Sequence, residues 1–168
     1  MYRRRALAIV VLLISSACGS GSSPPKAAEN AASHGGGGGD SPGDKCLAIA
    51  TAERHKRPDE PTRITVKHIL VKYAGAKGAA ATVVRTREAA CLRALEARDK
   101  LQQGTPWADA VAAYSEEAGA TTREGKIGYV ERADVVPPFA DAAFELGRGD
   151  VSHVVETPFG FHIILRSE

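Results

Sequence analysis

Residues 157–166, near the end of the chain, read Thr-Pro-Phe-Gly-Phe-His-Ile-Ile-Leu-Arg. Positions 160–166 include Phe161, Ile163 and Ile164 and predict a strand, and residues 151–155 predict another strand before it. Thr157, Pro158 and Phe159 lie between the two and indicate a turn. The stretch therefore predicts an antiparallel hairpin.

A third strand is predicted over residues 64–71, Ile-Thr-Val-Lys-His-Ile-Leu-Val, which are again rich in β-branched side chains. Because successive side chains of a strand alternate between its faces, Ile64, Val66 and His68 share one face. A histidine therefore lies in this strand, and another, His162, lies in the last one.

The segments between these strands predict three helices and one short strand. The helices run from a Thr86 cap to Gly104, from Thr105-Pro106 to Tyr114, and from Pro137-Pro138 to Gly147, and the short strand covers residues 127–130. Residues 74–82 and 119–126 are predicted loops. The order β-α-α-β-α-β-β is typical of the α+β class.

The N-terminus predicts an export signal over residues 1–17. Three arginines precede a run of nine apolar residues, 6–14, which at about 1.5 Å per residue is too short to cross a bilayer core of about 30 Å. Small residues 15–17 then precede Cys18, a pattern that resembles the lipobox of bacterial lipoproteins, although Ser15 stands where a leucine-like residue is usual. The alternative is an ordinary secretory signal cleaved near Ala17.

Residues 19–44 are rich in Gly, Ser, Pro and Ala, including five consecutive glycines, and residues 18–61 are predicted to form a flexible tether. Residues 46–57 have weak helical character but are not placed in the core. The folded domain is expected at 62–168, with 14 basic and 14 acidic residues, so that it is neutral although the whole chain carries a net charge of +2. Neutrality argues against a nucleic-acid partner. Outside the cytoplasm Cys46 and Cys91 could form a disulfide, or Cys91 could be a buried thiol and Cys46 a free one.

Several motifs together resemble the parvulin family of peptidyl-prolyl cis/trans isomerases (PPIases), over essentially all of residues 63–168. In order they are KHILV (67–71), RTREAA (85–90), YSEE (114–117), GKIG (125–128), VPPF (136–139) with Ala143-Phe144, LGRG (146–149) with Val151-Ser152, and TPFGFHII (157–164). Each motif alone is weak, but their order and spacing match the family throughout.

The resemblance implies a four-stranded antiparallel sheet surrounded by helices, with a substrate bowl on one face of the sheet. It places an apolar wall for the proline ring on Ile127, Val135 and Phe139, and Phe159 near the mouth of the bowl. Val135 is smaller than the methionine often found at this position, so we expect a wider slot. Each of these residues could alternatively be an ordinary core residue.

The polar floor of the family's site falls on His68, His162 and Thr157, and we expect both imidazoles to be neutral because burial penalises charge. Glu117 aligns with a position that carries cysteine or aspartate in relatives, with an uncertainty of one residue. Its carboxylate would repel the substrate carbonyl oxygen and help to twist the amide. The alternative is a solvated loop acid.

Phosphate-directed parvulins carry clustered arginines after the first strand, whereas this chain offers Lys72 and Lys77, which we expect to be solvated. Ordinary X-Pro bonds are therefore the expected substrates. No cofactor is expected. The histidines at 34, 55 and 153 lack ligand spacing, so no metal is expected either.

The sequence thus favours a PPIase that assists the folding of exported proteins by stabilising the twisted amide without covalent chemistry. The alternative is a non-catalytic, parvulin-like holdase that binds proline-containing segments. We expect a monomer, anchored through lipidated Cys18 and facing the periplasm. Gly19 is not the acidic residue that retains some lipoproteins at the inner membrane, which favours the outer membrane.

Overall fold

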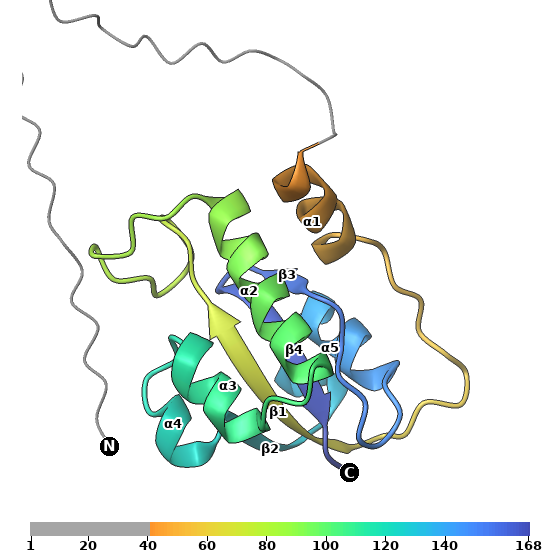
Figure 1. The fold of residues 1–168 in the computed structure, drawn as a ribbon. Coiled ribbons are helices and arrows are strands. Elements are labelled where there is room, and N and C mark those ends of the chain that lie inside the picture. Colours follow the sequence, from red (N-terminus) through yellow and green to blue (C-terminus); the bar gives the residue numbers. More distant parts are fainter. Residues whose placement is uncertain (1–40) are drawn as a thin grey trace, which may run out of the picture. The chain divides into compact units, whose positions relative to one another are not determined.

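The computed structural model describes residues 41–168, so the expected leader, Cys18 and most of the expected tether lie outside the described part. The elements, shown in Figure 1, are α1 (Pro42–Ala50), β1 (Ile64–Val71), α2 (Arg87–Gln102), α3 (Trp107–Tyr114), α4 (Ala120–Arg123), β2 (Lys126–Val130), the 3-10 helix η1 (Arg132–Asp134), α5 (Pro137–Phe144), β3 (Val155–Thr157) and β4 (Gly160–Arg166). None of these helices is both long enough and apolar enough to cross a membrane.

The four strands form one antiparallel sheet in the order β2-β1-β4-β3. The first and last strands of the chain are thus neighbours at its centre. This arrangement confirms the predicted α+β class and the four-stranded antiparallel sheet.

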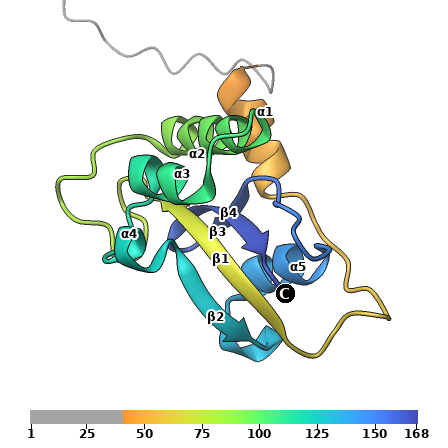
Figure 2. The same ribbon diagram turned by 60° about the horizontal axis from the view of Figure 1, so that its bottom comes forward.

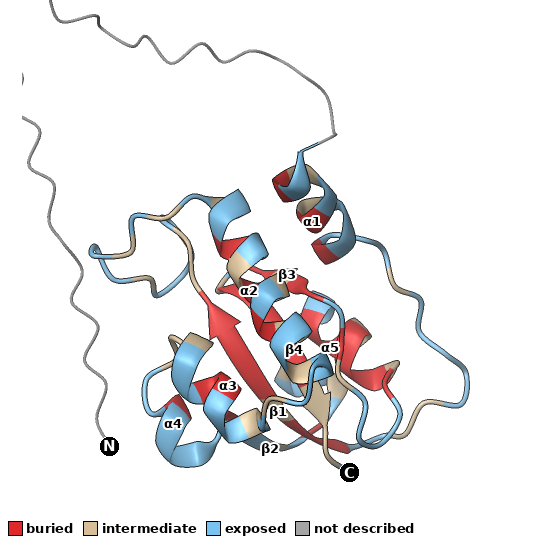
Figure 3. Ribbon diagram, in the orientation of Figure 1, coloured by how far each residue is buried: buried red, intermediate tan, exposed pale blue. Residues whose placement is uncertain are grey.

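Helices cover both faces of the sheet, with α2 and α3 on one face and α5 on the other (Figure 2). On the α2 face Ile69 and Phe161 join a cluster of buried side chains, and on the α5 face Val66 and Ile164 join another cluster around Phe144. The central strands are buried along nearly their whole length (Figure 3). Because neighbours in a strand face opposite ways, each strand supplies both clusters.

Helix α2 lies close to the sheet because its inner face is built from small residues. Thr86 caps the helix by accepting a hydrogen bond from the N–H of Ala89, as the sequence predicts. Ala90, Ala94 and Ala97 are fully buried, so no long side chain separates the helix from β4. The burial of this face, rather than helix propensity alone, stabilises α2.

The strand predicted over residues 151–155 is wrong in its bounds. Only Val155 belongs to β3, which continues to Thr157, while Val151 forms an isolated bridge with Leu165. Between them, the Ser152 hydroxyl accepts the N–H of Ile164 at 2.9 Å, a hydrogen bond that a strand carbonyl would otherwise take. The side chain therefore interrupts the regular ladder.

Two local predictions also differ from the structure. Residues 119–126, predicted as a loop, contain the single-turn helix α4. Helix α3 begins after Pro106, which occupies the N-cap position, and no side chain caps it, so Thr105 does not play the expected role. Proline fixes its own φ near the helical value. Its missing backbone N–H costs nothing at the start of a helix, where that group would have no intrahelical partner, so proline suffices to start the helix.

The prediction of a flexible tether through residue 61 does not hold for residues 42–50, which form helix α1. Ser41 and Asp44 cap this helix reciprocally. Cys46 is 2% exposed and forms a disulfide with Cys91 of α2, the Cα atoms lying 6.0 Å apart. Of the two alternatives for these cysteines, the structure therefore has the disulfide, and the folded unit includes α1.

The chain after α1 runs down the side of α5 towards β1 (Figure 1) and is held there by ion pairs. Arg54 pairs with Glu145, just past the end of α5. Glu60 has a 3% exposed side chain and accepts two hydrogen bonds from Arg132 of η1, at 2.8 and 2.9 Å. The Arg57 N–H and the Arg132 guanidinium lower the pKa of this carboxyl, outweighing its burial, which acts the other way.

We expect the double variant Cys46→Ala, Cys91→Ala to unfold more easily than the parent chain. The disulfide joins residues 45 positions apart, and closing a loop of this size in the unfolded chain is worth about 2–4 kcal/mol. The free energy of unfolding in urea measures the loss. An unchanged value would show that α1 docks without help from the bond.

Candidate active site

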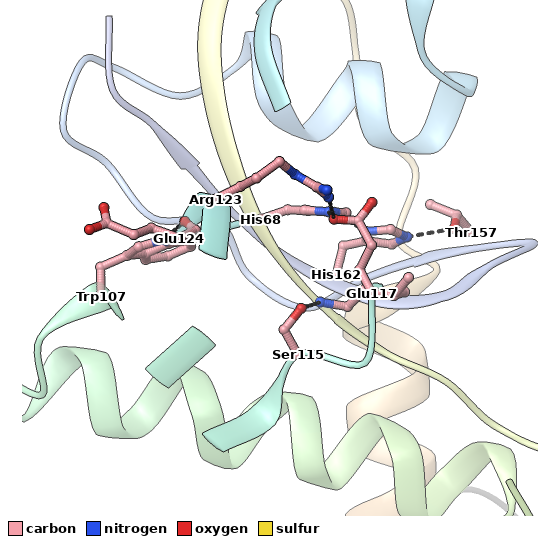
Figure 4. Close-up of polar contacts among 9 residues, drawn as sticks. His68, Trp107, Ser115, Glu117, Arg123, Glu124, Thr157 and His162 are labelled. Atoms are coloured by element: carbon pink, nitrogen blue, oxygen red, sulfur yellow. Dashed lines mark hydrogen bonds and ion pairs between the residues drawn. The ribbon is translucent and has the colours of Figure 1, made fainter. Parts of the chain in front are cut away.

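The two central strands bring His68 and His162 together on the α5 face of the sheet. In the β1–β4 register Leu70 pairs with His162 and Ile164 with His68, so the two imidazoles are diagonal neighbours. Their Nδ1 atoms lie 3.1 Å apart, and the rings are stacked with centroids at 5.3 Å (Figure 4). Both residues are buried, at 5% and 4% exposure.

Thr157 contacts the second histidine from the neighbouring strand β3. Its hydroxyl oxygen lies 2.8 Å from His162 Nε2 and accepts the N–H of Phe159 at 3.1 Å. The tight β3–β4 turn makes this contact possible, and Gly160 closes the turn with φ of +133°. A Cβ atom on Gly160 would collide with the carbonyl oxygen of Val71, so this position requires glycine.

Glu117 reaches the histidines from the segment after α3, which is hydrogen-bonded to β1. The Leu70 N–H donates to the Ser115 hydroxyl at 3.2 Å, and the Glu116 N–H donates to the Leu70 carbonyl at 2.7 Å. This pairing brings Glu117 Oε2 to 3.1 Å from His68 Nε2, although the carboxylate lies off the axis of a well-aligned hydrogen bond. The neighbouring acid, Glu116, turns away to Arg85.

Arg123 of α4, which the sequence analysis did not single out, pairs with Glu117 at 2.8 Å (Figure 4). The chain leaves α4 through Glu124, whose φ is +51°, and the Trp107 indole N–H donates to the Glu124 carbonyl at 2.9 Å. The His68 N–H then donates to the Gly125 carbonyl at 2.8 Å. No sequence signal marks Arg123, because it is one basic residue in a predicted loop.

One proton arrangement satisfies this network with both rings neutral. Thr157 donates its hydroxyl proton to His162 Nε2, and His162 Nδ1–H donates to His68 Nδ1. His68 Nε2–H then faces the Glu117 carboxylate. In this arrangement the contact with Thr157 determines that the proton of His162 lies on Nδ1.

The environment lowers the pKa of two groups in the network. The contact with His68, assisted by the charge of Arg123, lowers the pKa of Glu117 to about 2, so its carboxylate is ionised at neutral pH. Burial, together with the nearby His68, lowers the pKa of His162 to about 3. His162 is therefore neutral at physiological pH.

Apolar side chains stand beside this polar network. The Phe139 ring of α5 meets His162 edge to face at 5.3 Å and His68 at 6.0 Å between centroids. Val135, just before α5, is half-buried against the same cluster. Ile127 is 40% exposed and occupies a β-bulge, where the β1–β2 register skips it. A bulge can redirect the side chain of the extra residue.

Phe159, at the β3–β4 turn, is half-buried and contacts the loop that follows β1. The Lys77 ammonium lies 5.0 Å from the centre of the Phe159 ring, and the Lys77 N–H donates to the Pro158 carbonyl at 2.7 Å. The Lys72 ammonium donates to the Gly78 carbonyl at 2.8 Å. Lys77 is exposed, as expected, whereas Lys72 is half-buried and its ammonium is held by this hydrogen bond.

Among residues 41–168, no three His, Cys, Asp or Glu side chains lie close enough together to hold a metal ion. The arrangement instead offers a chain of hydrogen-bonding groups beside an apolar wall. Such a site can bind a group that is partly apolar and partly polar, and it can stabilise a change in hydrogen bonding without a nucleophile.

Residues 50–167 match the family model of the PPIC-type PPIase domain. The chain belongs to this family. The PPIC-type match confirms the resemblance to parvulins inferred from the motifs.

Relatives of this PPIC-type domain include chaperones and isomerases. It is 40% identical over 88 residues to the chaperone SurA of Chromobacterium violaceum, covering 49% of this chain and 20% of SurA. It is 32% identical over 112 residues to the putative peptidyl-prolyl cis-trans isomerase dodo of Drosophila melanogaster, covering 64% of this chain and 68% of dodo. The chain thus spans only a fifth of SurA's length.

Solved structures share the fold of this PPIC-type domain. The PPIase domain of TBPAR42 has a TM-score of 0.56 and 29% identity, covering 62% of this chain and 99% of that one. PrsA from Bacillus subtilis has a TM-score of 0.50 and 28% identity, covering 64% of this chain and 35% of PrsA. The isomerase fold therefore accounts for most of the described residues.

We expect the neutral, buried His162 to make the domain sensitive to acid. Between about pH 6.5 and 3 the unfolded chain binds a proton at this position and the folded chain does not, so the free energy of unfolding falls as the pH falls through that window. From pH 7 to pH 5 this group should remove about 2 kcal/mol. The measurement is the free energy of unfolding in urea at both pH values.

The variant His162→Gln should lack this part of the pH dependence, whereas His55→Gln, at an exposed position, should keep it. Equal pH dependence in His162→Gln and the parent chain would mean that His162 is charged in the folded protein.

Proposed function

We propose that this chain catalyses cis/trans isomerisation of X-Pro peptide bonds. The observation that carries the proposal is the hydrogen-bonded series Thr157, His162, His68 beside the Phe139 ring, in a chain of the PPIC-type PPIase family. The X-Pro bond rotates over a barrier of about 18–20 kcal/mol because amide resonance is lost on twisting. A catalyst must therefore bind the twisted amide more tightly than the planar one.

The apolar wall would hold the proline ring. Phe139 is 3% exposed and fixed in α5, so its ring provides a rigid surface, while Ile127 and Val135 lie at the edges. Holding the ring still lets the residue before the proline rotate about the C–N bond. Val135 is a small side chain for this role, which suits a broad range of proline-containing segments.

Glu117 would act on the carbonyl group of the rotating bond. In a planar amide the oxygen carries partial negative charge, which decreases as resonance is lost. An ionised carboxylate nearby therefore disfavours the planar form relative to the twisted one. Arg123 holds the Glu117 carboxylate in place at 2.8 Å and partly neutralises its charge, so the effect should be moderate. No covalent bond to the enzyme is needed.

A second candidate function is the capture of unfolded segments without catalysis. The names of two relatives, the chaperone SurA and the foldase PrsA, favour it. In this alternative the same apolar wall binds proline-containing segments, and the histidine pair only shapes the floor.

A proline-isomerisation assay on the full chain separates the two functions. We expect the rate for a short X-Pro peptide to exceed the uncatalysed rate in proportion to enzyme concentration, with no preference for phosphoserine before the proline. Peptide binding without acceleration would establish the holdase instead. A strong phosphoserine preference would contradict the expected substrate class.

The variants His68→Ala and Phe139→Ala should each lower kcat/KM at least several-fold. Their effects should differ, because the Phe139 ring binds substrate in both the planar and the twisted form, whereas His68 acts on the changing hydrogen bonds. Glu117→Gln keeps the shape of the side chain and removes its charge, so it should lower kcat with little change in KM. Ala112→Trp, on the exposed face of α3, is the control for folding.

We further propose that the protein is exported and held at the cell envelope by lipid on Cys18, facing the periplasm from the outer membrane, as a monomer. The leader of residues 1–17 supports export. The Cys46–Cys91 disulfide supports it independently, because such bonds persist in oxidising compartments. Exported proteins with proline-containing segments would be the substrates.

We expect the full chain, produced in a bacterium with a cell envelope, to collect in the membrane fraction, and the Cys18→Ser variant to be released in soluble form. Incorporation of labelled fatty acid into the parent chain, and its absence in the variant, measures the modification directly. A Cys18→Ser variant that stays bound to the membrane would contradict lipid anchoring.

A further inference from the structure

An open groove of about 600 Å³ lies beside the edge strand β3, and neither histidine of the candidate active site lines it. One wall is residues 50–55, the end of α1 and the chain that follows it. The other is residues 155–158, which are β3 and the first residue of its turn, and Pro138 of α5 closes one end. We call this the β3 groove. Its volume is typical of a ligand site.

The backbone of Glu156 points into the β3 groove. Residues in an antiparallel strand direct their N–H and C=O groups alternately to either side. The Ile164 carbonyl of β4 accepts the Ser152 N–H at 2.8 Å, so the even-numbered residues of β4 face towards β3. Val155 pairs with His162 and Thr157 with Gly160, which places Glu156 in the outward-facing position.

Glu156 therefore presents one donor and one acceptor at the edge of the sheet. An edge strand with free backbone groups is a template for another extended chain, which can add to the sheet through main-chain hydrogen bonds. The Glu156 side chain leaves these backbone groups free, because Arg87 and the Tyr73 hydroxyl hold its carboxylate. Tyr73 and Glu156 both line the groove.

The wall opposite β3 is fixed in place before any ligand binds. The Cys46–Cys91 disulfide ties α1 to α2, and the Arg54–Glu145 ion pair ties the following segment to the end of α5. Most of α1 lies before residue 50, where the family match begins. The residues that line the groove lie inside the family match, but the helix and the disulfide that hold one of its walls lie mostly before it.

The β3 groove is continuous with the candidate active site through Thr157. This residue lines the groove and also holds His162 through its hydroxyl at 2.8 Å. Asp141, Glu156 and Arg54 in the lining are already in ion pairs, with Arg132, Arg87 and Glu145. Glu53 also lines the groove and is exposed. Most of the charge in the lining is thus already paired, which leaves the backbone of β3 as the main polar feature that the groove offers to an extended chain.

We propose that the β3 groove binds an extended stretch of the same polypeptide whose proline occupies the active site, by adding it as a short strand to β3. This inference rests on the proposed function. The peptide residue opposite Glu156 would donate its N–H to the Glu156 carbonyl and accept the Glu156 N–H. Recognition through main-chain groups tolerates different sequences, as a protein acting on many unfolded chains requires.

The test compares a short X-Pro peptide with a longer one that extends it by about six residues on both sides, using the full chain. We expect the longer peptide to have a KM about tenfold lower, because two added hydrogen bonds at about 0.5–1 kcal/mol each give roughly this factor. N-methylation of the peptide residue opposite Glu156 should abolish the lower KM of the longer peptide. N-methylation of either neighbouring residue should not, because the N–H groups of the neighbours point away from β3.

The variant Ala52→Trp, at an exposed position that lines the groove, should remove the advantage of the longer peptide and leave the short peptide unchanged. Ala112→Trp on α3 is the matched control and should alter neither. The proposal would be overturned if the longer peptide kept the same KM advantage with Ala52→Trp as with the parent chain. It would also be overturned if N-methylation reduced this advantage equally at every position.

A failure of the proposed isomerase function would give a different experimental result from a failure of the groove proposal. If the chain does not accelerate isomerisation, fluorescence anisotropy of the labelled long peptide still reports binding to the groove. Weaker binding in Ala52→Trp alone would then support the groove and reject catalysis. Binding that is the same in Ala52→Trp, Ala112→Trp and the parent chain would reject the groove.

Discussion

The pairing of β1 with β4 is the constraint on which the rest of the structure depends. These strands come from opposite ends of the folded unit, and their register sets the two histidines diagonally across one face. A shift by one residue would move His162 to the α2 face and bring Phe161 into the site, because side chains alternate with a period of two. The fold and the site therefore depend on the same register.

Around this pair of strands, the polar and apolar halves of the site come from different parts of the chain. The hydroxyl of Thr157 comes from the β3–β4 hairpin and the Glu117 carboxylate from the segment after α3. The Phe139 ring comes from α5, which packs on the same face of the sheet as the histidines. Each is held by backbone hydrogen bonds or core packing. Such a site is preorganised, which is what stabilisation of a twisted amide requires.

The additions to the family's fold lie mainly at the N-terminal side. Helix α1 is short and would be marginal alone, since isolated helices of this length are unstable in water. The disulfide to α2 and the burial of Cys46 compensate, and the chain beyond α1 becomes a fixed wall beside β3. A segment whose composition resembles a linker thus contributes to the folded unit.

Alternation and caps in the sequence predicted β1, β4 and the main helices, because these are local patterns, and the resemblance to parvulins predicted that His68, His162 and Thr157 meet at the polar floor. The bounds of β3 were not predicted correctly. The pairing of Cys46 with Cys91, the contact of Arg123 with Glu117 and the direction of the Glu156 backbone became visible only in the folded structure. These depend on which segments, far apart in the chain, come to lie within a few ångströms of each other. Local propensity carries no information about that proximity, because packing of the whole core decides it.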